Sequence, residues 1–131
     1  MKKVITSVIS LALASSLYAG EVSSSNEMKK MADGMGLIMN GLLYNYLDNV
    51  SKGVDEIQAA TKDITSHDLK KFLPSDTAYA YKFGEKSFRR INEYANEVKD
   101  AMNVKDYEGA FESASLLMRQ CNSCHSRVRG W

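Results

Sequence analysis

The chain has 131 residues, a formal net charge of +1, 44% hydrophobic residues and two cysteines. One ordinary domain fits this length, and the near-neutral charge gives no reason to expect nucleic acid as a partner.

The first 19 residues have the pattern of a secretory signal peptide. The positively charged MKK precedes a short apolar stretch, VITSVISLALASSLYA, which ends in small residues. We expect cleavage after Ala19, which leaves one domain over residues 20–131 with a formal charge of −1. The apolar stretch is short and contains Ser and Thr, so an uncleaved membrane anchor is the alternative. We therefore expect a periplasmic protein without a membrane span after cleavage.

The remaining sequence predicts helices, because apolar residues recur at spacings of three and four and only one proline occurs. The first helix is expected over residues 24–50, with Ser24 and Glu27 as a capping box. Its expected apolar face consists of Met28, Met31, Met35, Ile38, Leu42 and Tyr46. Gly34, Gly36 and Gly41 each lower helix propensity by about 1 kcal/mol relative to Ala, so we expect a neighbouring helix or a flat ligand to approach them closely.

Three further helices are predicted. They cover residues 54–65, a segment capped by Ser75 or Asp76 that ends near Met102, and residues 106–128. Their expected inward residues are Val54, Ile57, Ala60 and Ile64; Tyr79, Phe83, Phe88 or Ile91, Val98 and Met102; and Phe111, Ala114, Leu117, Cys121, Cys124 and Val128. Four helices joined by short loops predict an all-α fold, an antiparallel up-down-up-down four-helix bundle.

Both cysteines and a histidine lie together in the last predicted helix, within the sequence CNSCH. At helical spacing, Cys121, Cys124 and His125 emerge on one face. C-x-x-C-H is the attachment pattern for c-type haem. Two thiols one turn apart can each add to one porphyrin vinyl group, and the adjacent imidazole can ligate the iron as proximal ligand. We therefore expect one covalently attached haem c on the C-terminal helix.

Three other chemistries use the same residue types. A thioredoxin-like redox pair belongs near a βαβ unit, which this helical sequence does not predict. A structural zinc site needs four ligands, and the distant His67 would have to be the fourth. A plain structural disulfide is the third alternative. His67 is otherwise expected to be a solvated or capping histidine of a loop.

Attachment on the last helix of a four-helix bundle resembles the class II cytochromes c, the family of cytochrome c-prime and its low-spin relatives. The resemblance implies a haem inside the bundle, with His125 as proximal ligand and Cys121 and Cys124 as thioether links. It also implies a basic residue close to the proximal imidazole, four positions after the histidine, and Arg129 occupies that position.

The same resemblance places the residue on the distal side of the iron in the first helix, followed by core residues three, seven and ten positions later. From Met28 these positions are all apolar, whereas from Met31 two of them are glycines. Met28 is therefore the expected distal ligand and Met31 the second choice. Methionine stripes also fill bundle cores without ligating a metal, so the packing alternative stays open.

These expectations combine into a mono-haem electron carrier that serves other periplasmic redox proteins and is not an enzyme, because no nucleophile–base pair or paired carboxylate site is evident. The alternative is a five-coordinate haem protein that binds nitric oxide or carbon monoxide. The resemblance also allows a homodimer.

Overall fold

The computed structural model describes residues 15–66 and 77–128, and nearly all of them are helical. The four helices are α1 (Ser15–Tyr44), α2 (Leu47–Ser66), α3 (Thr77–Asn103) and α4 (Tyr107–Val128). No strand occurs within these two stretches of the chain. The predicted all-α class with four helices is confirmed.

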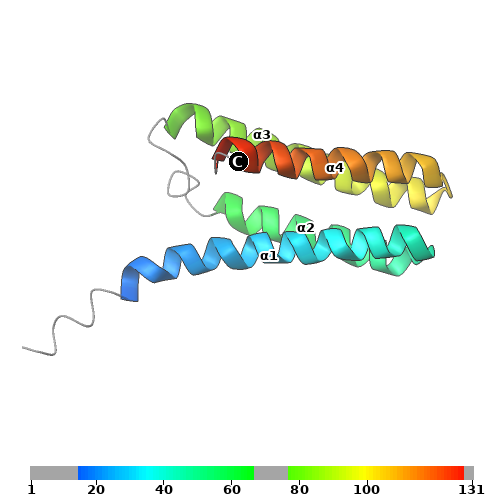
Figure 1. Cartoon of the computed structure of the whole chain (residues 1–131), viewed down its shortest axis with the longest axis horizontal. Coiled ribbons are helices and arrows are strands. Elements are labelled where there is room, and N and C mark those ends of the chain that lie inside the picture. Colours follow the sequence, from blue (N-terminus) through cyan, green and yellow to red (C-terminus); the bar gives the residue numbers. More distant parts are fainter. Residues whose placement is uncertain (1–14, 67–76, 129–131) are drawn as a thin grey trace, which may run out of the picture.

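Helices α1 and α2 pack along each other as a hairpin (Figure 1). Near the turn, Asn49 Nδ2 lies 2.7 Å from Asn40 Oδ1, and at the far end Lys30 Nζ lies 3.9 Å from Asp63 Oδ2. The two helices therefore run in opposite directions. Helices α3 and α4 form a second hairpin, with Glu97 beside Ser113 and Ser87 beside Gln120. Between the hairpins, α2 packs against α3 more extensively than α1 packs against α4.

Two glycines of α1 permit its close approach to α2. A Cβ added to Gly34 would lie 2.7 Å from the carbonyl oxygen of Gly53, and one on Gly53 would meet the carbonyl oxygen of Gly34. A Cβ on Gly41 would lie 2.5 Å from Val50 Cγ2. The expected helix contact is confirmed at these two α1 positions. It is wrong at Gly36, where a Cβ would meet nothing within 4 Å.

Apolar residues from all four helices form one core between the hairpins. Its most deeply buried large side chains are Ile38, Val50, Val54, Ile57, Ile91, Val98 and Leu117. The four inward residues predicted for α2 are all buried, as are Phe88, Ile91, Val98 and Met102 of α3. Helical periodicity therefore predicted most of the core.

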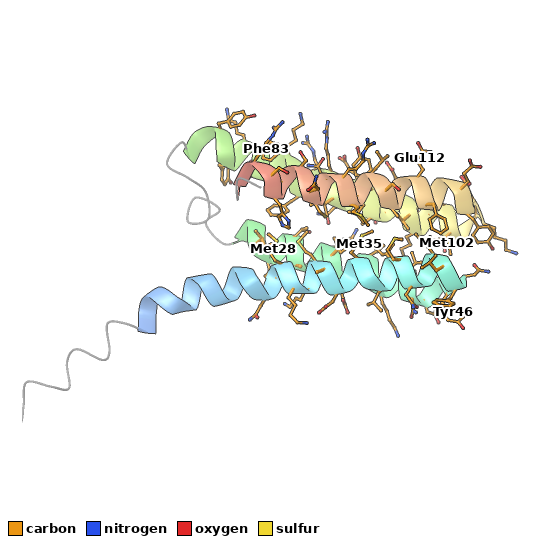
Figure 2. All side chains as sticks on the ribbon, viewed as in Figure 1. Met28, Met35, Tyr46, Phe83, Met102 and Glu112 are labelled. Atoms are coloured by element: carbon orange, nitrogen blue, oxygen red, sulfur yellow. The ribbon has the colours of Figure 1, made fainter. Side chains whose placement is uncertain are left out.

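The first predicted helix is wrong at both ends. α1 begins at Ser15, so it runs through Ser24 without a cap, and it stops at Tyr44 rather than Val50. Asn45 has a positive φ of 56°, which ends the helix, and α2 starts two residues later. Tyr46, expected in the core, is consequently exposed at the turn (Figure 2).

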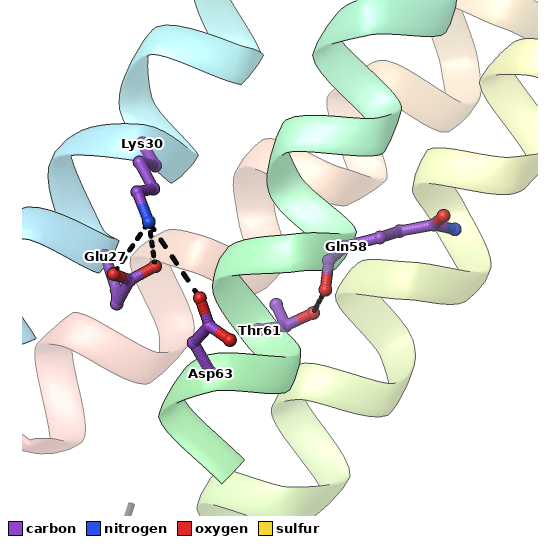
Figure 3. Close-up of polar contacts among 5 residues, drawn as sticks. All are labelled: Glu27, Lys30, Gln58, Thr61 and Asp63. Carbon is purple, nitrogen blue, oxygen red and sulfur yellow. Dashed lines mark hydrogen bonds and ion pairs between the residues drawn. The ribbon is translucent and has the colours of Figure 1, made fainter. Parts of the chain in front are cut away.

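Glu27 does not act in the predicted capping box. Its carboxylate accepts hydrogen bonds from Lys30 Nζ at 2.9 and 3.1 Å, and Lys30 also approaches Asp63 of α2 (Figure 3). Farther along α2, the Thr61 hydroxyl lies 2.9 Å from the carbonyl oxygen of Gln58 (Figure 3). Within the helices, polar side chains therefore connect neighbouring turns and neighbouring helices.

Besides Tyr46, two other aromatic residues predicted to point inward are exposed. Tyr79 is 65% exposed and Phe111 is 41% exposed, because Phe88 and Ile91 fill the core in α3 and Ala110, Ala114 and Leu117 fill it in α4. The expected caps at Ser75 and Asp76 lie outside the described residues. So does His67. None of the described helices is both long enough and apolar enough to cross a membrane.

Candidate cofactor site

The C-x-x-C-H residues occupy the last two turns of α4. The helix runs from Tyr107 to Val128 without a break, so Cys121, Cys124 and His125 are spaced by three and four residues and share one face. That face is turned toward the interior of the bundle, where Cys124 is buried and the other two side chains are half-buried. The sequence prediction of a common face is therefore met.

These three side chains line one apolar cavity of about 180 Å³. Its lining residues are Met28, Met31, Ala32 and Met35 of α1, Phe88 and Ile91 of α3, and Met118, Cys121, Cys124 and His125 of α4. Met28 and Met35 lie on the side of α1 that faces α4 (Figure 2). The cavity thus brings the predicted distal methionine and the predicted attachment residues to one place, although they are about a hundred residues apart in the sequence.

The lining chemistry suits a flat apolar group held from one side. Two thiols and an imidazole come from α4, thioethers come from α1, and the remaining lining residues are apolar. The cavity is smaller than a porphyrin, so a bound ring requires the methionine side chains to move aside. Unbranched methionines change rotamer readily and fit irregular spaces. The donor set and the adaptable wall therefore fit haem c.

Both cysteines are free thiols and form no disulfide with each other. Burial, and to a smaller extent the neighbouring Cys124, raises the pKa of Cys121 to about 11. Burial also raises the pKa of Cys124, while a hydrogen bond with Ser87 opposes that rise. Both groups are thus protonated near neutral pH. Catalytic redox cysteines have lowered pKa values, so the thioredoxin-like alternative loses support.

A polar contact between α3 and α4 lies beside Cys124. Ser87 of α3 is 1% exposed, and its hydroxyl accepts a hydrogen bond from Gln120 Nε2 at 3.1 Å. The same hydroxyl contacts the Cys124 thiol. Ser87 of α3 therefore contacts two residues of α4, Cys124 at the cavity and Gln120 one turn earlier.

The structure places both predicted distal residues at the cavity. Met31 is the more deeply buried, and Met28 is half-buried nearer the end of the bundle. A fourth methionine of α1, Met39, packs against the core but does not line the cavity. Arg129, expected beside the proximal imidazole, lies outside the described residues.

The sequence reasoning missed Met118 and left Phe88 and Ile91 undecided, and the cavity contains all three. A signal for Met118 was present, because it precedes Cys121 by three residues and so shares its helix face. For α3 the structure shows that both residues are buried, since they lie three residues apart on one face.

Among the described residues, no group of three or more His, Cys, Asp and Glu side chains is arranged to hold a metal ion. Comparison of the chain with protein-family models, curated proteins and solved structures finds no match.

Proposed function

We propose that the protein is a periplasmic mono-haem c-type cytochrome that carries single electrons between redox proteins. In this proposal the chain is an antiparallel up-down-up-down bundle with haem c attached to α4. The observation that supports it is the single apolar cavity shared by Met28 of α1 and by Cys121, Cys124 and His125 of α4.

Four residues of the cavity would hold the haem. Cys121 and Cys124 would hold haem c through thioether links, each formed by addition of a thiol across one vinyl group, with the thiol hydrogen going to the neighbouring carbon. His125 and Met28 would ligate its iron. Haem c supplies the one-electron chemistry when bound.

The bundle keeps that chemistry restricted to electron transfer. Phe88 and Ile91 exclude water from one side of the cavity, and the α1 methionines exclude it from the other. Two protein ligands that stay the same in both oxidation states limit reorganisation. A methionine opposite a histidine also raises the reduction potential.

The expected partners follow from the chemistry. The protein meets other periplasmic redox proteins through small transient interfaces, as electron-transfer proteins do. The signal peptide directs export and is then removed after Ala19. Pairing with a second copy of the chain belongs to the same proposal.

Absorption spectroscopy of Met28→Ala tests the distal ligand. The wild-type ferrous protein should show sharp, split low-spin bands that carbon monoxide does not change. Met28→Ala should give a broad high-spin spectrum that shifts with the gas, because one axial ligand is lost. Met39→Ala is the matched control and should keep the wild-type spectrum, since Met39 does not line the cavity.

A low-spin spectrum in Met28→Ala would contradict the assignment of Met28, and Met31→Ala is then the next variant. A colourless wild-type protein, made together with haem-attachment machinery, would contradict the haem proposal as a whole.

A second candidate function is capture of nitric oxide or carbon monoxide by five-coordinate iron. Ala32 favours it, because this small residue lines the α1 side of the cavity among the methionines and leaves room beside them. A wild-type spectrum that is already high-spin and responds to carbon monoxide would support this function and overturn the electron carrier.

A further inference from the structure

A second hollow lies on the outer side of α3 and α4, away from the methionines. This groove has a volume of about 430 Å³. Four of its lining residues are cationic, namely Lys82, Lys86 and Arg90 of α3 and Arg127 of α4. No Asp or Glu is among the described residues that line it. We call it the cationic groove.

Several basic residues elsewhere in the helices pair with carboxylates. Lys29 Nζ lies 2.6 Å from Asp33 Oδ2, and Lys99 Nζ lies 3.4 Å from Asp55 Oδ1. The three α3 cations of the groove have no such partner within 4.0 Å among the residues that the structure describes.

The three α3 cations also repel one another. They recur every four residues, so they stand in one row on the same helix face. Like charges at this spacing destabilise a helix by about 0.2–0.5 kcal/mol per pair. A negatively charged group in the groove would offset this repulsion and stabilise the helix.

Arg127 contacts two aromatic residues of α3. Its guanidinium carbon lies 4.5 Å from the centre of the Phe83 ring, and its Nη1 donates a 3.4 Å hydrogen bond to the Tyr79 hydroxyl. Tyr79 and Phe83 stack on each other, with ring centres 6.4 Å apart. A guanidinium fixed in this way keeps donors for a bidentate contact with a carboxylate or phosphate.

Neutral polar groups line the groove between the cations. Ser123 and Gln120 of α4 lie there with the buried Ser87 of α3. The aromatic pair supplies an apolar wall beside them. Cations, polar groups and an apolar wall thus surround one concave space.

We propose that the cationic groove binds a small organic anion that carries two or more carboxylate or phosphate groups. Several negative groups are needed to meet four cations spread over two helices. The concave volume falls in the range of about 300–1,000 Å³ found for small-molecule pockets, which favours a small ligand over a flat protein surface. This site does not depend on what the C-x-x-C-H motif holds.

Isothermal titration calorimetry of the purified full protein with citrate and, separately, with pyrophosphate tests the proposal. At fixed ionic strength, wild type should bind at least one of them with one-to-one stoichiometry, and the stronger of the two identifies the anionic group. Arg127→Gln should weaken that binding at least tenfold, and Lys86→Gln several-fold. Lys52→Gln, on the exposed face of α2, is the matched control and should bind as wild type does.

Circular dichroism checks that each variant is folded. If Arg127→Gln unfolds because it loses the Phe83 contact, the binding of the anion to Lys86→Gln and Lys82→Gln tests the proposal instead. Wild type that binds neither anion at millimolar concentration overturns the proposal, as does equal weakening in Lys52→Gln, which indicates non-specific attraction. Tighter saturable binding to polyglutamate than to either small anion also overturns it, in favour of an acidic protein partner.

Discussion

Two glycines of α1 that are separated by a single residue have opposite surroundings. Gly34 touches the backbone of α2 through Gly53, whereas a Cβ on Gly36 would reach open space. Both glycines lower the helix propensity of α1 equally. The sequence shows only that shared effect, because the approach of a second helix depends on which face of α1 it meets.

Substitution by alanine should therefore move stability in opposite directions at these positions. Gly36→Ala should raise the free energy of unfolding by about 0.5–1 kcal/mol, since it gains helix propensity in open space. Gly34→Ala should lower it by about 1 kcal/mol or more, because the overlap with Gly53 outweighs the same gain. Urea denaturation followed by circular dichroism measures both. Equal stabilisation of the two variants would contradict the close approach.

At the scale of single elements, α1 and α3 end in the same way. Asn45 and Lys105 have φ angles of 56° and 61°, and each next residue donates a backbone hydrogen bond of 2.8 Å to the carbonyl five positions earlier. This is the Schellman pattern. Asparagine tolerates this left-handed conformation. No glycine or proline marks the end of α1 in the sequence, and the apolar spacing continues to Tyr46. The predicted end of the helix was therefore several residues too late.

The start of α4 was predicted to within one residue, at Asp106 instead of Tyr107, and Asp106 caps the helix. The Asp106 carboxylate accepts a 3.0 Å hydrogen bond from the Gly109 amide, and the Asp106 carbonyl accepts one from the Ala110 amide. Asp106→Ala should lower the free energy of unfolding by about 1 kcal/mol through loss of this cap. Asp106→Asn is the control and should lose little, since asparagine caps equally well. Thermal or urea unfolding distinguishes the two, and equal losses would exclude the capping role.

The candidate site shows what periodicity can and cannot predict. The common face of Cys121, Cys124 and His125 follows from spacing within one helix. The meeting of that face with Met28 and Met35 depends on how the hairpins pack, and the sequence reached it only through the family resemblance. Met118 was not predicted, because the family resemblance places the distal residue in the first helix.

At the scale of the whole molecule, the α1–α2 and α3–α4 turns lie at the same end (Figure 1). The residues that line the cavity come from the N-terminal half of α1 and the C-terminal half of α4, and so lie toward the other end. Leu43, Tyr44, Tyr46 and Val104 are exposed beside the turns. The hairpins pack less extensively between α1 and α4, where the cavity is, than between α2 and α3. A covalently held ring there would join the two hairpins across the weaker of these two contacts.

Intact-mass spectrometry of the exported protein tests this arrangement. Wild type should begin at Gly20 and exceed the mass of its polypeptide by one haem, which stays attached under denaturing conditions. The variant with both Cys121→Ala and Cys124→Ala should lose that increment, and it should unfold at lower urea concentration because a group that binds the folded state is gone. A wild-type mass equal to the polypeptide alone would refute covalent attachment.

Ser87 separates two spaces by the thickness of one side chain, because it contacts Cys124 on one side and Gln120 of the cationic groove on the other. If both sites are filled as proposed, their ligands are thermodynamically linked. The ferric state carries one more positive charge than the ferrous state, so an anion in the groove should favour it and lower the reduction potential. By reciprocity, the oxidised protein should bind the anion more tightly than the reduced protein does. The ratio of the two affinities should equal the factor that corresponds to the shift in reduction potential. Redox titration with and without the anion and calorimetry in both oxidation states should give the same coupling, so that the proposed electron carrier would respond to the anions around it.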